Sequence, residues 1–314
     1  MKIAIIGAGA MGSLFGSLLS KVSQPVLYDL NTQHVGAIKE HGLRVSYPDR
    51  TETIAIHAVS DANELEAMDA VILFVKHPYT QGALQDGLKK AITPNTVVVS
   101  LQNGLGNTDL MKQVLNPAQI VYGFSTLTSD LVEPGHIHVT CDLSLHTAMW
   151  PLNHQPSPAL QRLCELMNQA GLNTSISANV EHDIWMKLLV NASLNSLCGI
   201  LQQTVGQVVN TPESRQLLDR IVFETADVAQ AKGLAISREK ALQHVLHVAE
   251  FTRDHIPSMA IDIRNRKPTE IEAINGAIVR QGQQLNVATP VTEFAANLVR
   301  SLQQHYPAPT PTSH

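Results

Sequence analysis

Cysteine is scarce in this chain of 314 residues, which contains Cys141, Cys164 and Cys198 and no others. Three cysteines that are odd in number and far apart form neither a disulfide framework nor a metal site. The chain is therefore expected to work in a reducing compartment and without a bound metal.

Charge is scarce as well, at 16% of the residues, and lysine and arginine are nowhere concentrated. The formal net charge of −5 gives no support to nucleic-acid binding. No apolar run of membrane-spanning length is recognised, and the apolar N-terminus is short, broken by glycines and without a convincing cleavage site. These absences predict a cytoplasmic protein that binds neither nucleic acid nor membrane.

The first half of the chain alternates short β-branched runs with helical patterns, which is typical of a parallel α/β fold. Residues 135–140 follow a turn and are expected to add an antiparallel strand. The other predicted strands are 2–6, 25–29, 52–59, 70–75, 96–101 and 119–124, and the predicted helices are 10–21, 31–41, 79–91 and 106–114.

The second half contains helical patterns alone from about residue 179 onward. This change in character predicts an α/β domain at 1–178 and an all-helical domain at 179–306, while the proline-rich residues 307–314 are expected to be disordered. The predicted helices are 181–201, 213–232, 237–254, 269–284 and 290–304.

The segment GAGAMG (7–12) matches G-x-G-x-x-G after a predicted strand and at the start of a predicted helix, which is the context of a Rossmann-like dinucleotide site. Gly7 would make the tight turn, Gly9 would let the backbone approach a pyrophosphate, and Gly12 would permit close helix–strand packing. A glycine-rich turn without a ligand is the alternative. The cofactor-binding candidates here are Gly7, Ala8, Gly9, Ala10, Met11 and Gly12.

Asp29 ends the second predicted strand, at a distance from Gly12 close to the roughly 20 residues expected of an acid that binds the adenosine ribose. A carboxylate there repels a 2′-phosphate and favours NAD over NADP. The alternative is that Asp29 caps the following helix. The sequence leaves this choice open.

Lys76 and Asn103 directly follow two further predicted strands, in FVKHP (74–78) and LQNGLG (101–106). Open α/β sheets bind ligands at the carboxyl ends of their strands, so both side chains are candidates for a ligand site. A solvated lysine and a simple Asn-Gly turn are the alternatives.

In the apolar stretch 181–201, Lys187, Asn191 and Asn195 recur at intervals of four. Four residues of an α-helix turn by about 400° and rise about 6 Å, so these side chains are predicted to form one ridge roughly 12 Å long. Burying them without partners would be costly, so the ridge must face water, a polar network or a ligand. Spacing alone does not decide between a solvated stripe and the wall of a cleft.

A second group of polar residues lies in IPSMAIDIRNRKPTEIEAINGAI (256–278). Ser258 follows a proline and could cap a helix. Glu270 is predicted to begin a new helix, where an acid favours the positive end of the helix dipole. Neither residue is specific alone.

Together these residues resemble the ketopantoate reductase (2-dehydropantoate 2-reductase) family over roughly residues 1–303. The resemblance implies a Rossmann-like domain followed by an all-α domain similar to that of 6-phosphogluconate dehydrogenase. It also implies NADPH-dependent reduction of ketopantoate to (R)-pantoate in pantothenate biosynthesis. The landmarks are GAGAMG, FVK (74–76), QNG (102–104), PG (134–135), W-M-K-L-x-x-N-x-x-x-N (185–195) and S-M-x-x-D-I-R…T-E-I-E-x-I-N-G (258–276).

The family's pattern implies a role for each matching position. Lys187 corresponds to the proton donor to the substrate carbonyl, and Glu270 to a glutamate near that lysine and the cofactor ribose. A proton donor is required because hydride arriving at a ketone creates an alkoxide. The remaining implied contacts are Asn191, Asn195 and Ser258 for the substrate, and Lys76, Asn103 and, more loosely, Ser129 for the cofactor.

Several positions depart from the family's pattern. Asn31 stands in place of the arginine that selects NADPH, with Asp29 two residues before it, which makes NADH a serious alternative. His255, Pro257 and Ile261 replace residues expected around the substrate. The chain could therefore be a paralogue that acts on another small 2-oxo or 3-hydroxy acid, or, against its intact catalytic set, an inactive nucleotide-binding protein. A homodimer is one option for the assembly.

Overall fold

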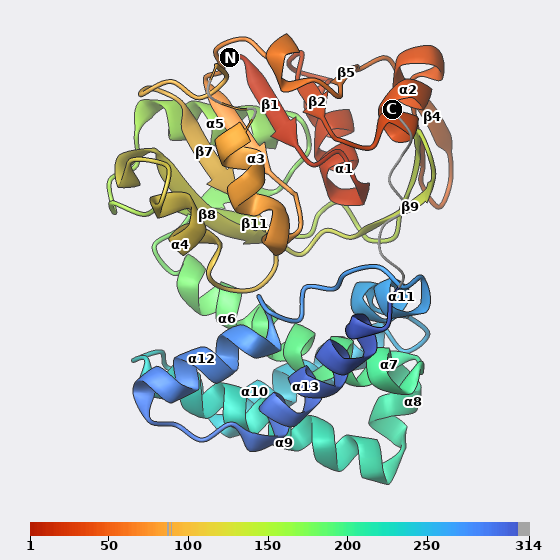
Figure 1. Cartoon of the computed structure of the whole chain (residues 1–314), viewed down its shortest axis with the longest axis vertical. Helices are drawn as coiled ribbons and strands as arrows, with labels where there is room; N and C mark the ends of the chain where they lie inside the picture. Colours follow the sequence, from red (N-terminus) through yellow and green to blue (C-terminus); the bar gives the residue numbers. More distant parts are fainter. Residues whose placement is uncertain (87, 89, 307–314) are drawn as a thin grey trace. The chain divides into compact units, whose positions relative to one another are not determined.

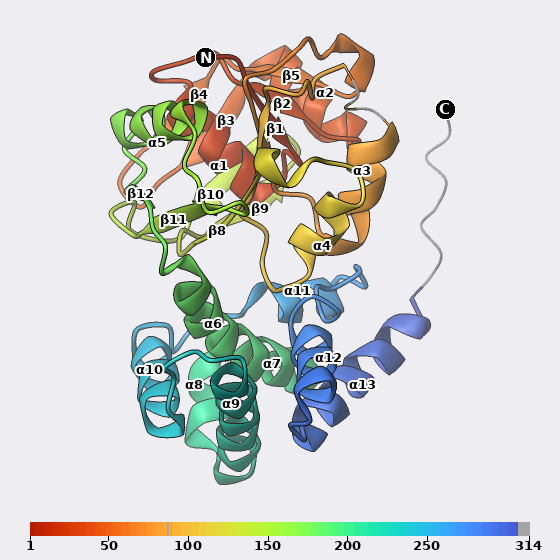
Figure 2. The same cartoon turned by 90° about the vertical axis from the view of Figure 1, so that its left-hand side faces the viewer.

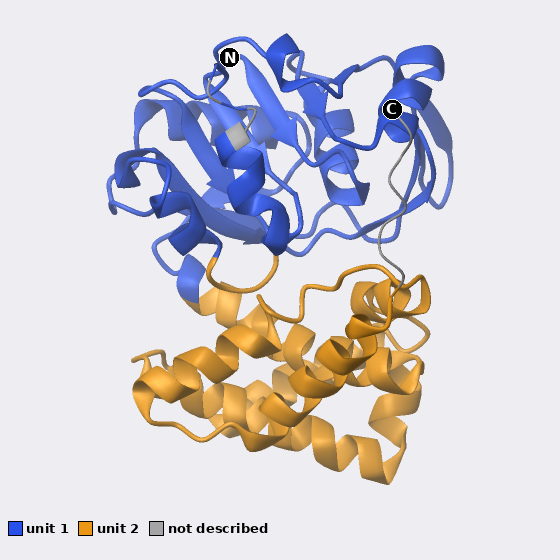
Figure 3. Cartoon of the chain, viewed as in Figure 1, with its two compact units in different colours: residues 1–102, 107–181 blue, residues 103–106, 182–314 orange. Residues whose placement is uncertain are grey.

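The computed structural model describes residues 1–86, 88 and 90–306, so the tail predicted to be disordered, 307–314, lies outside the described residues. The chain divides into two compact units (Figure 3). Unit 1 comprises residues 1–102 and 107–181, and unit 2 comprises residues 103–106 and 182–314. The short segment 103–106 thus belongs to the unit formed by the second half of the chain.

Unit 1 is built on an eight-stranded sheet of order β12-β11-β8-β7-β6-β1-β2-β5 (Figure 1). The strands from β5 to β8 are parallel, whereas β11 is antiparallel to β8. This arrangement confirms the predicted Rossmann-like class. The strands are β1 (Ile3–Ile6), β2 (Val26–Tyr28), β5 (His57–Val59), β6 (Ala70–Leu73), β7 (Val97–Ser100), β8 (Ile120–Ser125), β11 (Thr147–Pro151) and β12 (Thr174–Ile176).

A second sheet of order β4-β3-β10-β9 corrects two predictions. The single strand predicted at 52–59 is wrong, because β4 (Thr51–Ile54) pairs with β3 (Leu43–Ser46) in this sheet and β5 pairs with β2 in the other. The strand predicted at 135–140 is β10 (His136–Val139), which is antiparallel to β9 (Ser129–Glu133) but parallel to β3. The strands that pair with each segment, and not the local pattern, thus decide which sheet it joins.

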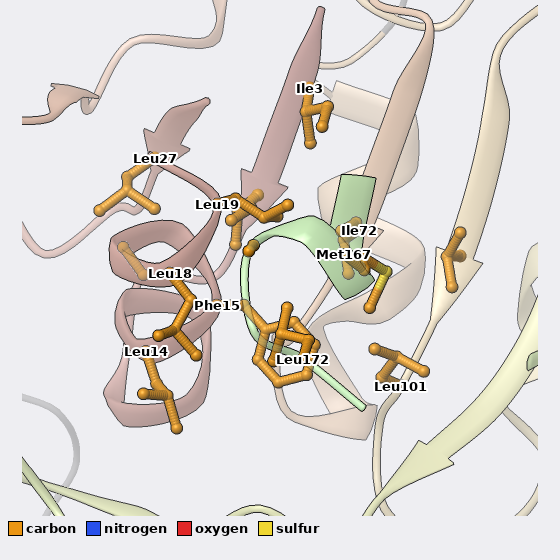
Figure 4. Close-up of a cluster of buried hydrophobic side chains, with 14 of the residues drawn as sticks. Ile3, Leu14, Phe15, Leu18, Leu19, Leu27, Ile72, Leu101, Met167 and Leu172 are labelled. Atoms are coloured by element: carbon orange, nitrogen blue, oxygen red, sulfur yellow. The ribbon is translucent and has the colours of Figure 1, made fainter. Parts of the chain in front are cut away.

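The central parallel strands β1, β6 and β7 are buried along their whole length, as expected for strands covered on both faces. Ile3 and Ile5 pack with Phe15 and Met167 on one face, where α1 and α5 lie (Figure 4). Ala4 and Ile6 pack on the opposite face with residues of α3 and α4. The helices of unit 1 are α1 (Ala10–Leu19), α2 (Thr32–His41), α3 (Thr80–Asp86), α4 (Asn107–Lys112) and α5 (Pro158–Gln169).

The described residues of unit 2 form helices joined by turns and loops, without a strand, as predicted. Helices α8, α9 and α10 pack together, and α12 packs against α13 (Figure 2). Two short helices, α8 and α11, were not predicted. The elements are α6 (Val180–Val190), a π-helical segment (Asn191–Asn195), α7 (Ser196–Leu201), α8 (Val205–Asn210), α9 (Pro212–Ala231), α10 (Arg238–Phe251), α11 (Ser258–Arg264), α12 (Asn275–Leu285) and α13 (Pro290–Gln304).

The continuous helical stretch Val180–Leu201 is 22 residues long and contains a window of mean hydropathy 1.4. It has the length and composition of a membrane-spanning helix, which the sequence analysis did not recognise. In the structure 61% of that window is buried in the protein. Its fully buried Trp185 lies among the core side chains of unit 2, as in the central helix of a globular domain.

Candidate active site

The glycine-rich turn joins β1 to α1 in the geometry expected of a dinucleotide site. Gly7 has φ +92°, and a Cβ there would lie 2.6 Å from the Val75 nitrogen; a Cβ on Gly12 would lie 1.9 Å from the Gly7 oxygen. At Gly9, by contrast, a Cβ would meet no described atom within 4 Å, so protein packing does not explain this glycine. Open space beside the N-terminus of α1 fits a bound pyrophosphate.

A buried hydrogen-bond chain holds this turn. The Gly135 N–H donates to His34 Nδ1 (3.0 Å), which leaves the proton of a neutral ring on Nε2, beside Ser13 Oγ (3.2 Å). Ser13 Oγ in turn donates to the Ala8 carbonyl (2.7 Å). Burial lowers the pKa of His34, opposed by the nearby Asp29 carboxylate, so the neutral form is favoured. His34 and Ser13 carried no recognisable sequence signal.

Asp29 and Asn31 lie where the adenosine ribose is predicted. Asp29 Oδ1 accepts a hydrogen bond from the Asn31 N–H (2.9 Å), and Asn31 Oδ1 accepts one from the His34 N–H (3.1 Å). The N-cap of α2 is therefore Asn31, which removes the alternative that Asp29 caps this helix directly. The guanidinium of Arg44, the next arginine along the chain, binds Glu133.

Lys76 and Ser129 both lie near the glycine-rich turn in unit 1. Lys76 follows β6 and caps a short 3₁₀ turn (His77–Tyr79), directly after the Val75 that a side chain on Gly7 would strike. Ser129 begins β9, and its Oγ lies 3.7 Å from Met11 Sδ. The glycine-rich turn, Asp29 and Lys76 thus follow the carboxyl ends of the neighbouring strands β1, β2 and β6, whereas Ser129 contacts the turn through Met11.

In unit 2, Asn103 links the two predicted catalytic residues. Lys187 Nζ donates to Asn103 Oδ1 (2.8 Å), and Asn103 Nδ2 donates to Glu270 Oε2 (3.0 Å). Asn103 was predicted only as a cofactor contact. Its amide accepts a hydrogen bond from the ammonium and donates one to the carboxylate, so it positions both groups at once.

The backbone beside Asn103 docks against a turn at residues 270–274. Gly104 has φ +78°, and a Cβ there would lie 2.2 Å from the Ala273 oxygen. The Leu105 N–H donates to the same carbonyl (2.8 Å). Glycine is therefore required at position 104 for both its backbone conformation and its close approach.

The helix predicted to start at residue 269 begins later, at Asn275, so the interpretation of Glu270 as a first-turn acid is wrong. Residues 270–274 form turns in which the Ala273 and Ile274 N–H groups donate to the Glu270 carbonyl. Ile274 has φ −99° and ψ −95°, which is not helical. The turn exposes the Ala273 carbonyl to Leu105, a contact distant in sequence that the local pattern does not reveal.

The residue Lys187 is partly buried as a whole. Burial lowers its pKa from 10.5 to about 8, and the nearby Glu270 carboxylate opposes this shift. Such a lysine is mostly protonated at neutral pH yet gives up a proton more readily than an exposed one. It therefore has the properties of a general acid.

We expect kcat for carbonyl reduction to be constant in mildly acidic buffer and to fall through an apparent pKa of about 8, because only the ammonium form donates a proton. The reverse oxidation should rise through the same pKa. Replacement Glu270→Gln should move both midpoints to lower pH, because the carboxylate raises the pKa of Lys187. pH–rate profiles in both directions measure this, and profiles without an inflection in this range would contradict it.

The predicted polar ridge is present, but its helix is not a uniform α-helix. Asn191 and Asn195 are the first and last residues of the π-helical segment. Asn195 is 8% exposed, and Lys187 and Asn191 are partly buried, which argues against a solvated stripe. The buried leucines Leu188 and Leu194 pack in the core, as expected for the flanks of the ridge.

Ser258 is exposed at the first position of α11, and its side chain does not cap that helix. Helix α11 packs closely against α7, where a Cβ on Gly199 would lie 2.8 Å from Ile263 Cδ1. The substituted positions His255 and Ile261 lie just before and within the same helix. Among the described residues, no group of three or more His, Cys, Asp or Glu side chains could hold a metal ion.

The residues that support the ridge were not among the predicted site residues. Asn275 is fully buried and donates from Nδ2 to the Ala192 carbonyl (2.9 Å) inside the π-helical segment. Glu272, the second acid of T-E-I-E, binds the side chains of Arg300 and Arg280. Asn275 belongs to the I-N-G landmark quoted above, so the sequence could have indicated that this residue has a role. Nothing in the local sequence indicated that its partner is the Ala192 carbonyl.

Comparison with known proteins covers nearly the whole chain. Residues 3–151 match the family described as Ketopantoate reductase PanE/ApbA, and residues 179–303 match Ketopantoate reductase PanE/ApbA C terminal. A relative from Lactococcus lactis subsp. lactis, named 2-dehydropantoate 2-reductase, is 35% identical over 310 residues, which are 97% of this chain and 98% of the relative.

Two solved structures are similar as well. D-mandelate dehydrogenase with NADH and anilino(oxo)acetate superposes with a TM-score of 0.91 at 32% identity, over 97% of this chain and 99% of that one. A PanE/ApbA family ketopantoate reductase from Ralstonia eutropha JMP134 gives a TM-score of 0.87 at 29% identity, over 97% and 100% of the two chains.

Proposed function

The chain belongs to the ketopantoate reductase PanE/ApbA family, and from this premise we propose that it reduces a 2-oxo acid to the 2-hydroxy acid with NADH as its preferred cofactor. Members of this family are NAD(P)-dependent oxidoreductases that act on CH–OH groups, and the chain is one of them. The first substrate to test is ketopantoate, reduced to (R)-pantoate as in pantothenate biosynthesis, because the curated relatives are named for it.

The hydrogen-bonded set Lys187–Asn103–Glu270 is the observation that carries this proposal. When bound, the nicotinamide supplies a hydride to the carbonyl carbon of the 2-oxo acid. The oxygen of that substrate carbonyl then gains negative charge. Lys187 Nζ stabilises that oxygen and donates a proton to it. Asn103 Oδ1 fixes one N–H of the ammonium, which orients the remaining protons. Asn191, Asn195 and Ser258 are proposed to bind the polar groups of the acid.

Steady-state kinetics with ketopantoate and with phenylglyoxylate, each with NADH and NADPH, test the proposal. Turnover of at least one 2-oxo acid is expected. Cofactor binding without turnover of any acid in a wider panel would overturn it in favour of an inactive nucleotide-binding protein.

An aryl 2-oxo acid is the second candidate substrate. His255, Pro257 and Ile261 depart from the family's pattern, and the D-mandelate dehydrogenase structure, which contains an aryl-substituted oxo acid analogue, is similar over nearly the whole chain. A higher kcat/KM for phenylglyoxylate than for ketopantoate would establish this candidate. The homodimer and the cytoplasmic location remain predictions.

The preference for NADH is proposed to come from Asp29. Replacement Asp29→Asn should improve kcat/KM for NADPH relative to NADH by about tenfold, because it removes a charge that repels the 2′-phosphate and keeps an acceptor for the Asn31 N–H. Asp142→Asn is the matched control, since Asp142 Oδ1 accepts the Ser144 N–H (2.8 Å) in a similar turn. An unchanged ratio in Asp29→Asn would contradict the assignment.

A further inference from the structure

The π-helical segment Asn191–Asn195 separates Lys187 on α6 from Asn195 at the start of α7. In a π turn the N–H groups bond carbonyls five residues back instead of four, so one extra residue is accommodated. Each residue of an α-helix turns the chain by about 100°, so the extra residue rotates every later side chain by about this angle. The π turn therefore decides which way Asn195 points relative to Lys187.

Side chains, and not the helix alone, hold this turn. The Ala192 carbonyl accepts hydrogen bonds from Ser196 Oγ (2.6 Å) and from Asn275 Nδ2 (2.9 Å). Ser193 Oγ donates to the Leu189 carbonyl one turn earlier (2.7 Å). Ser193 and Ser196 are local to the helix, whereas Asn275 comes from the start of α12 and ties the turn to another element.

Asn275 is poorly suited to a purely stabilising role. Its side chain is 0% exposed, and its Oδ1 has no hydrogen-bond partner among the described residues. A half-satisfied buried amide is less stable than an apolar side chain of similar size. Its donor, however, reaches a carbonyl of the π turn.

We propose that Asn275 is a positioning residue for substrate binding: it holds the π turn and thereby aims Asn191 and Asn195 at the same substrate that Lys187 protonates. This inference rests on the proposed 2-oxo acid reductase function. It assigns Asn275 no contact with substrate or cofactor. Loss of its donor allows the segment to relax to an ordinary α-helix, which turns Asn195 away from Lys187.

Replacement Asn275→Leu tests the proposal, because leucine fills a similar volume without a donor. The KM for the 2-oxo acid should rise at least tenfold, with a smaller change in kcat and an unchanged Kd for NADH measured by fluorescence. Asn275→Ala should behave alike, since alanine also has no donor for the Ala192 carbonyl, and it provides a second variant if Asn275→Leu does not fold. A KM unchanged in both variants would overturn the proposal.

The control is Thr225→Val, which removes a buried hydroxyl-to-carbonyl bond of unit 2, from Thr225 Oγ1 to the Ile221 oxygen (2.7 Å), that includes no residue of the π turn. It should lower stability and leave KM unchanged. Hydrogen exchange of amides 191–196 should accelerate in Asn275→Leu and not in Thr225→Val. This readout needs no substrate, so it tests the positioning role even if the wild-type protein reduces no 2-oxo acid.

Discussion

Replacement Lys187→Met is expected to lower kcat for 2-oxo acid reduction by about 100- to 10,000-fold, the range lost with a general acid. The Kd for NADH should stay unchanged, because the dinucleotide residues of the glycine-rich turn lie in the other unit. Methionine keeps the length of the side chain without its charge. Stopped-flow turnover and NADH fluorescence titration measure the two effects.

Lys240→Met, on the exposed surface of α10, is the matched control and should leave kcat unaltered. A Lys187→Met enzyme with wild-type kcat would show that another group donates the proton. Lys187→Arg should be almost as slow, because a guanidinium keeps the charge but does not release a proton near neutral pH.

Replacement Lys187→Met also has a predictable effect on the stability of the fold. The pKa of Lys187 in the folded chain is about 8, below its ordinary value of 10.5, so folding disfavours the charged form. This penalty is fully present below pH 8 and disappears as the pH rises through the ordinary pKa. The free energy of unfolding should therefore increase over this window in the wild type and not in Lys187→Met. If Lys187→Met is folded and stable but inactive, the loss of activity comes from the missing ammonium and not from a disrupted fold.

The sequence indicated candidate residues for the site but not the hydrogen bonds that hold them. The glycine-rich turn was recognisable from its local context, and Lys187 and Glu270 were recognisable from the resemblance to the family's pattern. The hydrogen bonds through Asn103 were not, since they join positions 84 and 167 residues apart. Local patterns carry no information about such partners.

The errors in the fold have the same origin. The strand predicted at 52–59 divides because β3 and β2 pair with its two ends in different sheets. The helix predicted from 269 begins late because the turn before it bonds the backbone of Leu105. The π turn in NASLN looks like α-helix in sequence, and its distant support comes from Asn275.

One segment, residues 270–275, therefore supports the site at three points. Glu270 binds the Asn103 side chain, the Ala273 carbonyl binds the backbone beside it, and Asn275 binds the π turn. A continuous helix from residue 269 would tie up the Ala273 carbonyl in its own hydrogen bonds. The irregular backbone before α12 thus allows this one segment to position the general acid Lys187, through Asn103, and also the asparagines of the π turn.

Replacement Gly104→Ala is expected to lower kcat/KM by about 100-fold, since misplacing a catalytic group by about 1 Å can cost this much. The new Cβ would lie 2.2 Å from the Ala273 oxygen, so the backbone must withdraw. This movement of the backbone breaks the hydrogen bond from the Leu105 N–H to the Ala273 carbonyl. It also pulls the Asn103 side chain out of its place between Lys187 and Glu270. The pH midpoint of the residual activity should also shift, because the ammonium loses a fixed partner.

Gly171→Ala separates this effect from simple backbone strain. Gly171 has φ +88°, so alanine there is strained by roughly 1–2 kcal/mol, but its Cβ would meet no described atom within 4 Å. The control should lose stability and keep its kcat/KM and pH midpoint. If Gly104→Ala behaved like Gly171→Ala, the docking of residues 104–105 on Ala273 would not be what positions Asn103. Loss of activity in Gly104→Ala alone would assign that role to the contact between these two backbones.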